Sequence, residues 1–90
     1  MEEDIKPIEK YLNKVNICKT QGEFDALVDF IFNLGLGSFK SSTLYKYIKA
    51  GRSDDDICSQ FRRWVYANGK KLNGLVRRRE AECDLWMSNK

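Results

Sequence analysis

The sequence predicts an all-α fold, and three observations indicate it. Apolar residues recur at three- and four-residue spacing along most of the chain, which is the periodicity of amphipathic helices. A single proline and six glycines leave little room for a β fold rich in turns. No alternating stretch is long enough to predict a strand. Since 90 residues with 42% hydrophobic content suit one compact core, we expect a single domain, residues 1–90, of about five helices.

The first expected helix is amphipathic and contains the only proline. Its apolar face consists of Ile5, Ile8, Leu12 and Val15. Pro7 is tolerated in the first turn of a helix, where its missing N–H would be unpaired in any case. The helix should therefore begin near Asp4, and a kink at Pro7 is the alternative.

The second expected helix has the clearest boundaries. Thr20 and Glu23 form a capping box, in which each side chain accepts a hydrogen bond from a free backbone amide of the first turn. The helix is apolar over most of its circumference, which predicts burial. Its apolar residues are Phe24, Ala26, Leu27, Val28, Phe30, Ile31, Phe32 and Leu34. Gly35 is expected to end it as a left-handed cap.

Three more helices are expected in the second half of the chain. One runs roughly from Ser42 to Ala50 and ends at Gly51. The next is capped by Ser53 and continues to Asn68-Gly69. Its apolar stripe consists of Ile57, Phe61, Trp64 and Val65. The last follows the KKLNG loop and reaches nearly to the C-terminus, with an apolar set of Leu75, Val76, Cys83, Trp86 and Met87.

The cysteines and the acidic run do not predict a metal site or a cofactor. Cys18, Cys58 and Cys83 form no CxxC motif, and the chain has no histidine. Nucleophilic catalysis is also disfavoured, because no histidine could activate a serine or cysteine. The run Asp54 to Asp56 lies in an expected first helical turn, where the helix dipole favours carboxylates, so helix capping accounts for it.

The charge pattern does not favour nucleic acid as a partner. The net charge is only +3, and the consecutive residues Arg77, Arg78 and Arg79 would point in three directions, about 100° apart on a helix. One of the three is expected to face a carboxylate and the other two to face solvent. A nucleic-acid groove would need more positive charge on one face.

The sequence also predicts no membrane span. The longest apolar stretch, Ile31 to Phe39, is interrupted by polar residues and is shorter than the ~20 residues that a span requires. The N-terminal residues MEEDIKP do not resemble a secretory signal, so a cytoplasmic location is expected.

Carboxylate chemistry is the remaining catalytic option. Asp25 and Asp29 are four residues apart, so they share one helix face at a separation near that of the two carboxyls in retaining glycosidases. A general acid at neutral pH would also need a raised pKa from an apolar pocket. The polar edge of a buried helix is the simpler interpretation, and no catalytic residue is predicted.

Two segments carry a family resemblance. Phe24 to Leu44, FDALVDFIFNLGLGSFKSSTL, resembles the substrate-cleft helix and turn of phage-type lysozymes, the endolysins or muramidases of glycoside hydrolase family 24. Gln60 to Trp86 is similar to their closing helices. Its matching features are Arg63-Trp64, the Gly69 loop, Gly74-Leu75, and the run Arg77 to Glu80 with Glu82. Asn73 departs from the family, where many relatives have proline. The resemblance covers roughly Asp4 to Met87, which corresponds to the C-terminal helical lobe.

This resemblance implies a muramidase fold without its catalytic segment. The family hydrolyses the MurNAc–GlcNAc β-1,4 bond in peptidoglycan with a glutamate, an aspartate about nine positions later, and then a threonine. No glutamate of this chain has an aspartate nine positions on. Met1 to Val15 resembles the helix that follows the β-containing catalytic lobe in relatives, so that lobe is expected to be missing and the chain inactive by itself.

What the resemblance carries over is one wall of the cleft. The matching residues are Phe32, Asn33, Gly35, Phe39, Ser42 and Thr43. Asn33 offers a donor and an acceptor to N-acetyl groups, and Phe32 and Phe39 could stack on sugar rings. Core packing is the alternative for both phenylalanines.

Two functional hypotheses therefore rank ahead of a third, a small nucleic-acid-binding helical domain. In the first, the chain is a lysozyme-family domain whose activity depends on a catalytic lobe supplied elsewhere. That lobe could be a separate chain, an upstream reading frame, or sequence removed from this one. In the second, it is a non-catalytic remnant that binds peptidoglycan or a protein, including a second copy of itself, through the exposed half-cleft. In both, the protein would act at the cell wall once released.

Overall fold

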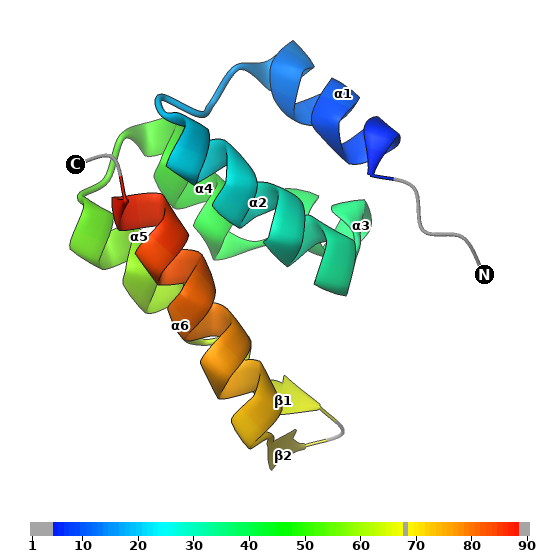
Figure 1. The fold of residues 1–90 in the computed structure, drawn as a ribbon, viewed down its shortest axis with the longest axis vertical. Helices are drawn as coiled ribbons and strands as arrows, with labels where there is room; N and C mark the ends of the chain where they lie inside the picture. Colours follow the sequence, from blue (N-terminus) through cyan, green and yellow to red (C-terminus); the bar gives the residue numbers. More distant parts are fainter. Residues whose placement is uncertain (1–4, 68, 89–90) are drawn as a thin grey trace.

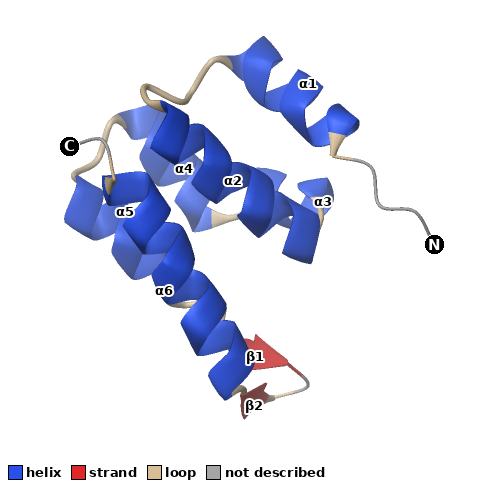
Figure 2. Cartoon of the chain, in the orientation of Figure 1, coloured by secondary structure: helices blue, strands red, loops and turns tan. Residues whose placement is uncertain are grey.

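The protein is almost entirely helical. The structure is a computed structural model that describes residues 5–67 and 69–88. Within these residues there are six helices and one hairpin of two very short strands (Figure 2). This confirms the all-α expectation. The sequence did not indicate the short helix α3 (Leu36–Lys40) or the hairpin.

Helix α2 (Gln21–Leu34) is the centre of the fold. It packs against α1 (Lys6–Val15), against α3 and, most extensively, against α6 (Asn73–Met87). Ala26, Leu27 and Phe30 on α2 are completely buried. The core around them consists of Ile8, Leu12, Ile31, Phe39, Leu44, Ile57, Cys58, Phe61, Cys83 and Trp86. A helix that is apolar on most sides therefore lies where neighbours cover most of its surface, as expected.

The capping box of α2 is confirmed in a slightly altered form. The Thr20 hydroxyl accepts a hydrogen bond from the backbone amide of Glu23 at 3.1 Å. Glu23 reaches back to the amide of Lys19, at 2.9 Å, one residue earlier than in the usual motif. Pro7 lies in the first turn of α1, as expected. The start predicted near Asp4 lies outside the described residues.

Gly35 ends α2, but not as the predicted left-handed cap. Its dihedral angles are φ 95° and ψ 152°, a region that essentially only glycine occupies. The reason is that Gly35 serves two helices. Its N–H donates to Ile31 at the end of α2, and its carbonyl accepts from Phe39 in α3. The extended ψ angle of Gly35 directs the chain from the end of α2 straight into α3.

Two serines begin the following helices, as the sequence predicts. The Ser42 hydroxyl accepts from the amide of Tyr45 and starts α4 (Thr43–Ala50). The Ser53 hydroxyl accepts from the amide of Asp56 and starts α5 (Asp54–Phe61). Gly51 ends α4 in the left-handed conformation, with φ 72°.

Helix α5 is shorter than the sequence indicated. It ends at Phe61, and the amides of Arg63 and Trp64 bond to carbonyls three residues back, in a tightened turn. Trp64 and Val65 therefore lie beyond the helix. These two residues keep the helical spacing of apolar side chains, but they contact the core from a turn. Local periodicity does not distinguish such a turn from a helix.

A small hairpin takes the place of the expected end of α5. Strand β1 (Tyr66–Ala67) pairs antiparallel with β2 (Lys70–Lys71), so that Tyr66 lies opposite Lys71. Gly69 provides the turn, with φ 79°. Figure 1 shows the hairpin at the far end of α6, away from the other helices.

Helix α6 closes the fold against α2 and α5. The indole of Trp86 donates to the Asp54 carboxylate at the start of α5, at 2.9 Å. Among the residues that the structure places, no helix has both the length and the apolar character needed to cross a membrane.

Candidate functional site

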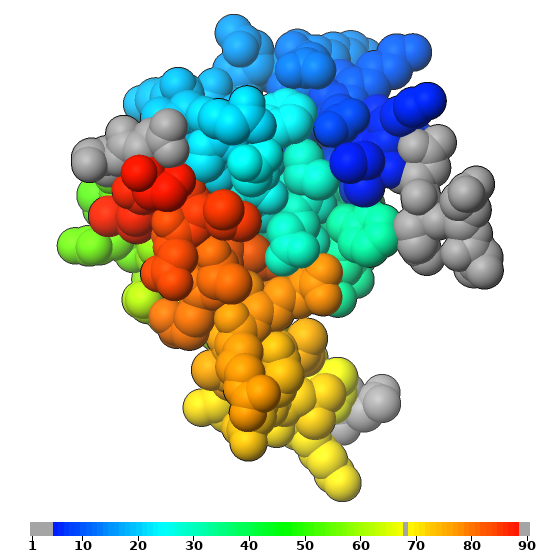
Figure 3. All heavy atoms as spheres, viewed as in Figure 1, coloured from blue at the N-terminus to red at the C-terminus, as the bar shows by residue number. Residues whose placement is uncertain are grey.

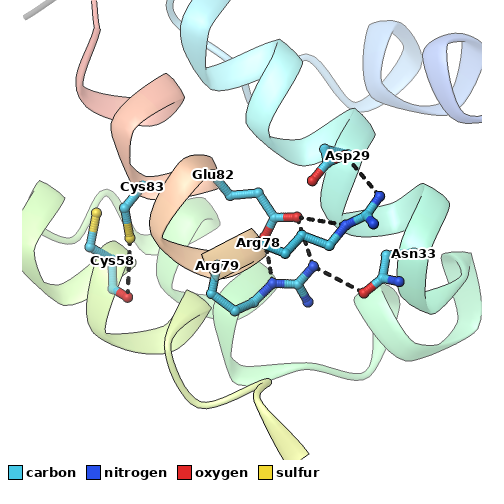
Figure 4. Close-up of polar contacts among 7 residues, drawn as sticks. All are labelled: Asp29, Asn33, Cys58, Arg78, Arg79, Glu82 and Cys83. Atoms are coloured by element: carbon cyan, nitrogen blue, oxygen red, sulfur yellow. Dashed lines mark hydrogen bonds and ion pairs between the residues drawn. The ribbon is translucent and has the colours of Figure 1, made fainter. Parts of the chain in front are cut away.

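The main polar cluster lies where α6 crosses α2. Two α2 side chains, Asp29 and Asn33, face the basic side chains Arg78 and Arg79 of α6, and Glu82 lies one turn further along (Figure 4). Arg78 donates to Asp29 at 3.0 Å, and Arg79 donates to the Asn33 carbonyl oxygen at 3.0 Å. The cluster thus joins α2 and α6 over two turns.

The ion pair of Arg79 with Glu82 is the buried part of this cluster. Both side chains are 0% exposed. Arg79 approaches the two carboxylate oxygens through Nε at 2.7 Å and Nη2 at 2.8 Å. Its guanidinium also lies 5.1 Å from the Phe30 ring centre, within cation–π range. These contacts compensate the two buried charges in part, since Nη1 of Arg79 has no hydrogen-bond partner among the described residues.

Glu82 has one property of a general acid but no access to a substrate. Burial raises the pKa of its carboxyl, Asp29 adds to this, and the two arginines act in the opposite direction. A raised pKa is typical of a catalytic acid. However, the side chain is completely buried and its oxygens face Arg79, so the carboxyl cannot reach a glycosidic oxygen. We therefore interpret Glu82 as a structural residue.

Asp29 is also unsuited to act as an acid. Partial burial acts to raise the pKa of its carboxyl, but contacts with Glu82 and with Arg78 outweigh this, so the pKa is lowered. A carboxyl held ionised in this way cannot donate a proton at neutral pH. Asp25, the second member of the predicted pair, accepts a hydrogen bond from Gln21 at 2.8 Å. This geometry agrees with the expectation that the pair is the polar edge of α2.

A groove of about 280 Å³ runs along α1 and α2 beside this edge. Its walls are mainly apolar, with carboxylates among them. The lining consists of Ile5, Glu9, Gln21, Phe24, Asp25, Val28, Asp29 and Phe32. Ile5 and Phe32 are each 39% exposed, so both leave apolar surface open beside the carboxylates. The groove is therefore an acidic and apolar surface that the described part of the chain leaves uncovered.

The predicted cleft residues at the end of α2 lie at the surface. Phe32 lines the groove, so core packing does not describe it. Asn33 is exposed, and its carbonyl oxygen is held by Arg79. Gly35 is exposed, and a Cβ added there would meet no other atom within 4 Å. All three residues are exposed at one end of α2, and the Asn33 side chain turns toward Arg79 on α6.

The other three predicted residues have different environments. Phe39 is completely buried, with its ring 6.3 Å from Phe30 and 4.9 Å from Tyr45, so it has no face open to a sugar. Ser42 is 4% exposed and donates to the carbonyl of Phe39 at 2.6 Å. Thr43 is exposed and lines a polar pocket of about 290 Å³. The lining of that pocket is Thr43, Gln60, Arg63 and Trp64.

The structure does not gather the six predicted residues into one cavity. Phe32 and Thr43 belong to two pockets that have no lining residue in common. Asn33 lies in the last turn of α2, and Gly35 joins α2 to α3. A role of this surface in sugar binding stays a prediction.

The thiols of Cys18 and Cys83 are not activated. The Cys83 thiol donates to the carbonyl of Cys58 at 3.6 Å, and both residues are buried (Figure 4). Burial, followed by the effect of Glu23, raises the pKa of Cys18 to about 11. A nucleophilic cysteine needs a lowered pKa instead. Within residues 5–67 and 69–88, no cluster of acidic residues and cysteines is arranged to hold a metal ion.

The arginine run contributes more to the site than the sequence indicated. Two of the three arginines, rather than one, pair with carboxylates, and only Arg77 is exposed without such a partner in the described structure. The spacing of Arg79 and Glu82, three residues apart, was the available signal. It did not show that both would be buried, because burial depends on how α6 lies on α2.

The fold and this cluster define a class of protein: a helical lobe of the lysozyme type, with a central buried helix joined to the closing helix by ion pairs. The family model described as Phage lysozyme matches residues 1–82. The chain belongs to the phage lysozyme family.

Several phage endolysins are similar to this chain over nearly its whole length. The endolysin of Bacillus phage B103 is 43% identical over 98% of this chain and 32% of its own length. The SAR-endolysin of Escherichia phage Mu is 38% identical over 96% of this chain and 50% of its own length. The endolysin of Acyrthosiphon pisum secondary endosymbiont phage 1 is 36% identical over 98% of this chain and 63% of its own length. The chain thus spans about a third to under two thirds of these relatives.

Proposed function

We propose that this chain is the helical lobe of a phage lysozyme and supplies one wall of a peptidoglycan-binding cleft. The exposed end of α2 is the observation that supports it. Phe32 and Asn33 are consecutive exposed residues in the last turn of α2, and Arg79 donates to the Asn33 carbonyl oxygen at 3.0 Å. The amide nitrogen of Asn33 is left to donate to an N-acetyl carbonyl, while the Phe32 ring offers an apolar face to a sugar.

Hydrolysis of the MurNAc–GlcNAc bond by this lobe requires a separate catalytic segment. Asp29 is held ionised, and Glu82 is enclosed, so neither supplies a proton to the bond. The family spacing of a glutamate and an aspartate does not occur in these 90 residues. We propose that the chain accumulates in the cytoplasm and acts at the wall when it is released.

A peptidoglycan pull-down tests the cleft wall. Asn33→Ala and Phe32→Ala should each reduce the fraction of protein retained by purified sacculi. Asn13→Ala, at an exposed asparagine on α1, is the matched control and should bind as the parent chain does. Circular dichroism on each variant separates lost binding from lost folding. Equal retention of all four proteins would refute the cleft wall.

A turbidity assay on permeabilised Gram-negative cells tests the dependence on a catalytic segment. The purified chain alone should leave the turbidity unchanged. Lysis by the chain alone would show that a carboxyl assigned here to structure is catalytic after all. Asp29→Asn and Glu82→Gln would then identify which one.

The acidic and apolar groove supports a second candidate function, a non-catalytic remnant that binds a protein. Ile5 and Phe32 leave apolar surface uncovered beside Glu9 and Asp25. Such surface commonly marks an interaction site, here for a separate catalytic lobe or a second copy of the chain. Sedimentation equilibrium distinguishes the last case: Phe32→Ser should shift a self-associating chain toward monomer. A parent chain that is monomeric at all concentrations excludes self-association.

A further inference from the structure

One long segment of the chain contains basic residues and no acidic ones. Residues 62–79 include no aspartate or glutamate. Their basic side chains are Arg62, Arg63, Lys70, Lys71, Arg77, Arg78 and Arg79. Three of these are used internally, since Arg62, Arg78 and Arg79 pair with Glu80, Asp29 and Glu82. In the part of the chain that the structure places, the other four are exposed and have no carboxylate partner.

Three of these side chains, those of Lys70, Lys71 and Arg77, belong to a projection of the molecule. The hairpin and the first turns of α6 extend beyond the rest of the fold, in yellow and gold in Figure 3. The projection is fixed at its base, because Val65 is buried and its carbonyl accepts from the amide of Leu72 at 3.0 Å. We name it the basic tip, made of Tyr66, Lys70, Lys71, Leu72 and Arg77.

The basic tip also exposes apolar side chains. Tyr66 is 62% exposed and Leu72 is 43% exposed. Tyr66 lies directly opposite Lys71 in the hairpin, so both side chains leave the same face. A tyrosine beside a lysine places an aromatic ring and a flexible cation at one surface.

This combination favours a lipid surface over a dissolved polyanion. A polyanion would engage the lysines and arginines but would leave Leu72 in water. At a bilayer interface, leucine and the tyrosine ring enter the region between headgroups and acyl chains while lysine reaches the phosphates. The hairpin is a thin ribbon, so cations on both of its faces lie within about one Debye length, ~8–10 Å, of a surface approached end-on.

We propose that the basic tip attaches the protein to membranes rich in anionic phospholipid. Lys70 and Lys71 contact the headgroup phosphates, and Tyr66 and Leu72 enter the interface. Arg63 and Arg77 add attraction at longer range. The attachment is reversible and peripheral, and it is independent of peptidoglycan binding by the end of α2, which lies on other residues.

Vesicle co-sedimentation of the full chain tests the proposal. The chain should sediment with phosphatidylglycerol vesicles and not with pure phosphatidylcholine vesicles, and added salt should release it. Lys70→Glu/Lys71→Glu should weaken the partition coefficient at least ~10-fold. Lys10→Glu/Lys14→Glu, at exposed positions on α1, makes the same change in net charge and should have a much smaller effect.

A second variant separates lipid from other anions. Tyr66→Ser should reduce vesicle binding about 3- to 10-fold while leaving retention on heparin unchanged. Helical circular dichroism confirms that each variant is folded. Equal losses for the two lysine pairs would show a general effect of net charge and overturn the proposal. Tyr66→Ser with unchanged vesicle binding would also overturn it, since the tip would then bind phosphate as a soluble polyanion site does.

Discussion

Arg79 and Glu82 lie one turn apart on α6 and form an ion pair entirely inside the protein, with Nε and Oε1 2.7 Å apart and both side chains 0% exposed. Arg79 also reaches across to Asn33, which is 46 positions away in the sequence. One buried guanidinium thus connects the closing helix to the exposed end of α2 that we assign to the cleft wall.

Removal of one partner of this pair should be strongly destabilising. Glu82→Gln or Arg79→Met leaves the other group buried without its main charged partner, at a cost of about 3–5 kcal/mol in the free energy of unfolding. Urea unfolding followed by circular dichroism measures it. The double variant Arg79→Met/Glu82→Leu should be more stable than either single variant.

Glu80→Gln, which breaks the exposed pair with Arg62, is the control and should cost ~1 kcal/mol or less. Similar losses for Glu80→Gln and Glu82→Gln would contradict this account of burial.

The lowered pKa of Asp29 should appear in the pH dependence of stability. A carboxyl whose pKa is lower in the folded state stabilises the fold above its unfolded pKa of about 3.9, and this stabilisation is lost as pH falls through the folded pKa. Asp29→Asn should therefore be less stable at pH 7 and lose less stability than the parent chain on acidification. Urea midpoints at a series of pH values measure the effect. Identical profiles for the parent and Asp29→Asn would argue against the ion pair with Arg78.

The conformation of Gly35 gives a matched pair of glycine substitutions. Gly35→Ala should destabilise by about 1–3 kcal/mol, because φ 95° with ψ 152° is strained for any residue with a Cβ. Gly37→Ala should be neutral or stabilising by up to ~1 kcal/mol, since Gly37 lies inside α3 at ordinary φ. Neither site has an atom within 4 Å of the added Cβ, so the difference isolates the backbone. Thermal unfolding measures both, and equal effects would mean that Gly35 is free of strain.

Loss of the Thr20 cap should weaken α2 at its first turn. Thr20→Ala removes the acceptor for the amide of Glu23 and should cost about 1 kcal/mol. Ser59→Ala changes an exposed hydroxyl within α5 and should change stability little. Hydrogen exchange gives a local readout, because the amide of Glu23 should lose protection in Thr20→Ala and keep it in Ser59→Ala. Unchanged protection would show that the cap is not what holds this turn.

The helices were largely predictable because their signals are local. Thr20, Ser42 and Ser53 each cap an amide three residues along the chain, and Gly51 ends α4 with its own backbone. Such contacts depend on the residues of a single turn. The end of α5 was mispredicted for the complementary reason. Trp64 and Val65 continue the helical spacing of apolar residues, but both lie in a turn beyond the helix. The spacing of apolar residues indicates which side chains are buried, and it does not show which backbone hydrogen bonds form.

The candidate site was predictable only in part. Phe32 and Phe39 had the same two possible interpretations, and the structure separates them into a groove residue and a core residue. That outcome depends on how α1, α4 and the rest of the fold cover each phenylalanine. The uncovered groove along α1 and α2 was not visible in the sequence, because its lining comes from two helices.

By itself, the sequence determined the helical class, most helix starts and the family, since these depend on periodicity, caps and motifs within short windows. The tertiary structure alone decided which arginines are paired, that Glu82 is enclosed, and that a basic tip extends from the fold. Those properties depend on long-range packing of α6 on α2 and on the hairpin, which places residues tens of positions apart within a few ångströms and sets their burial and charge.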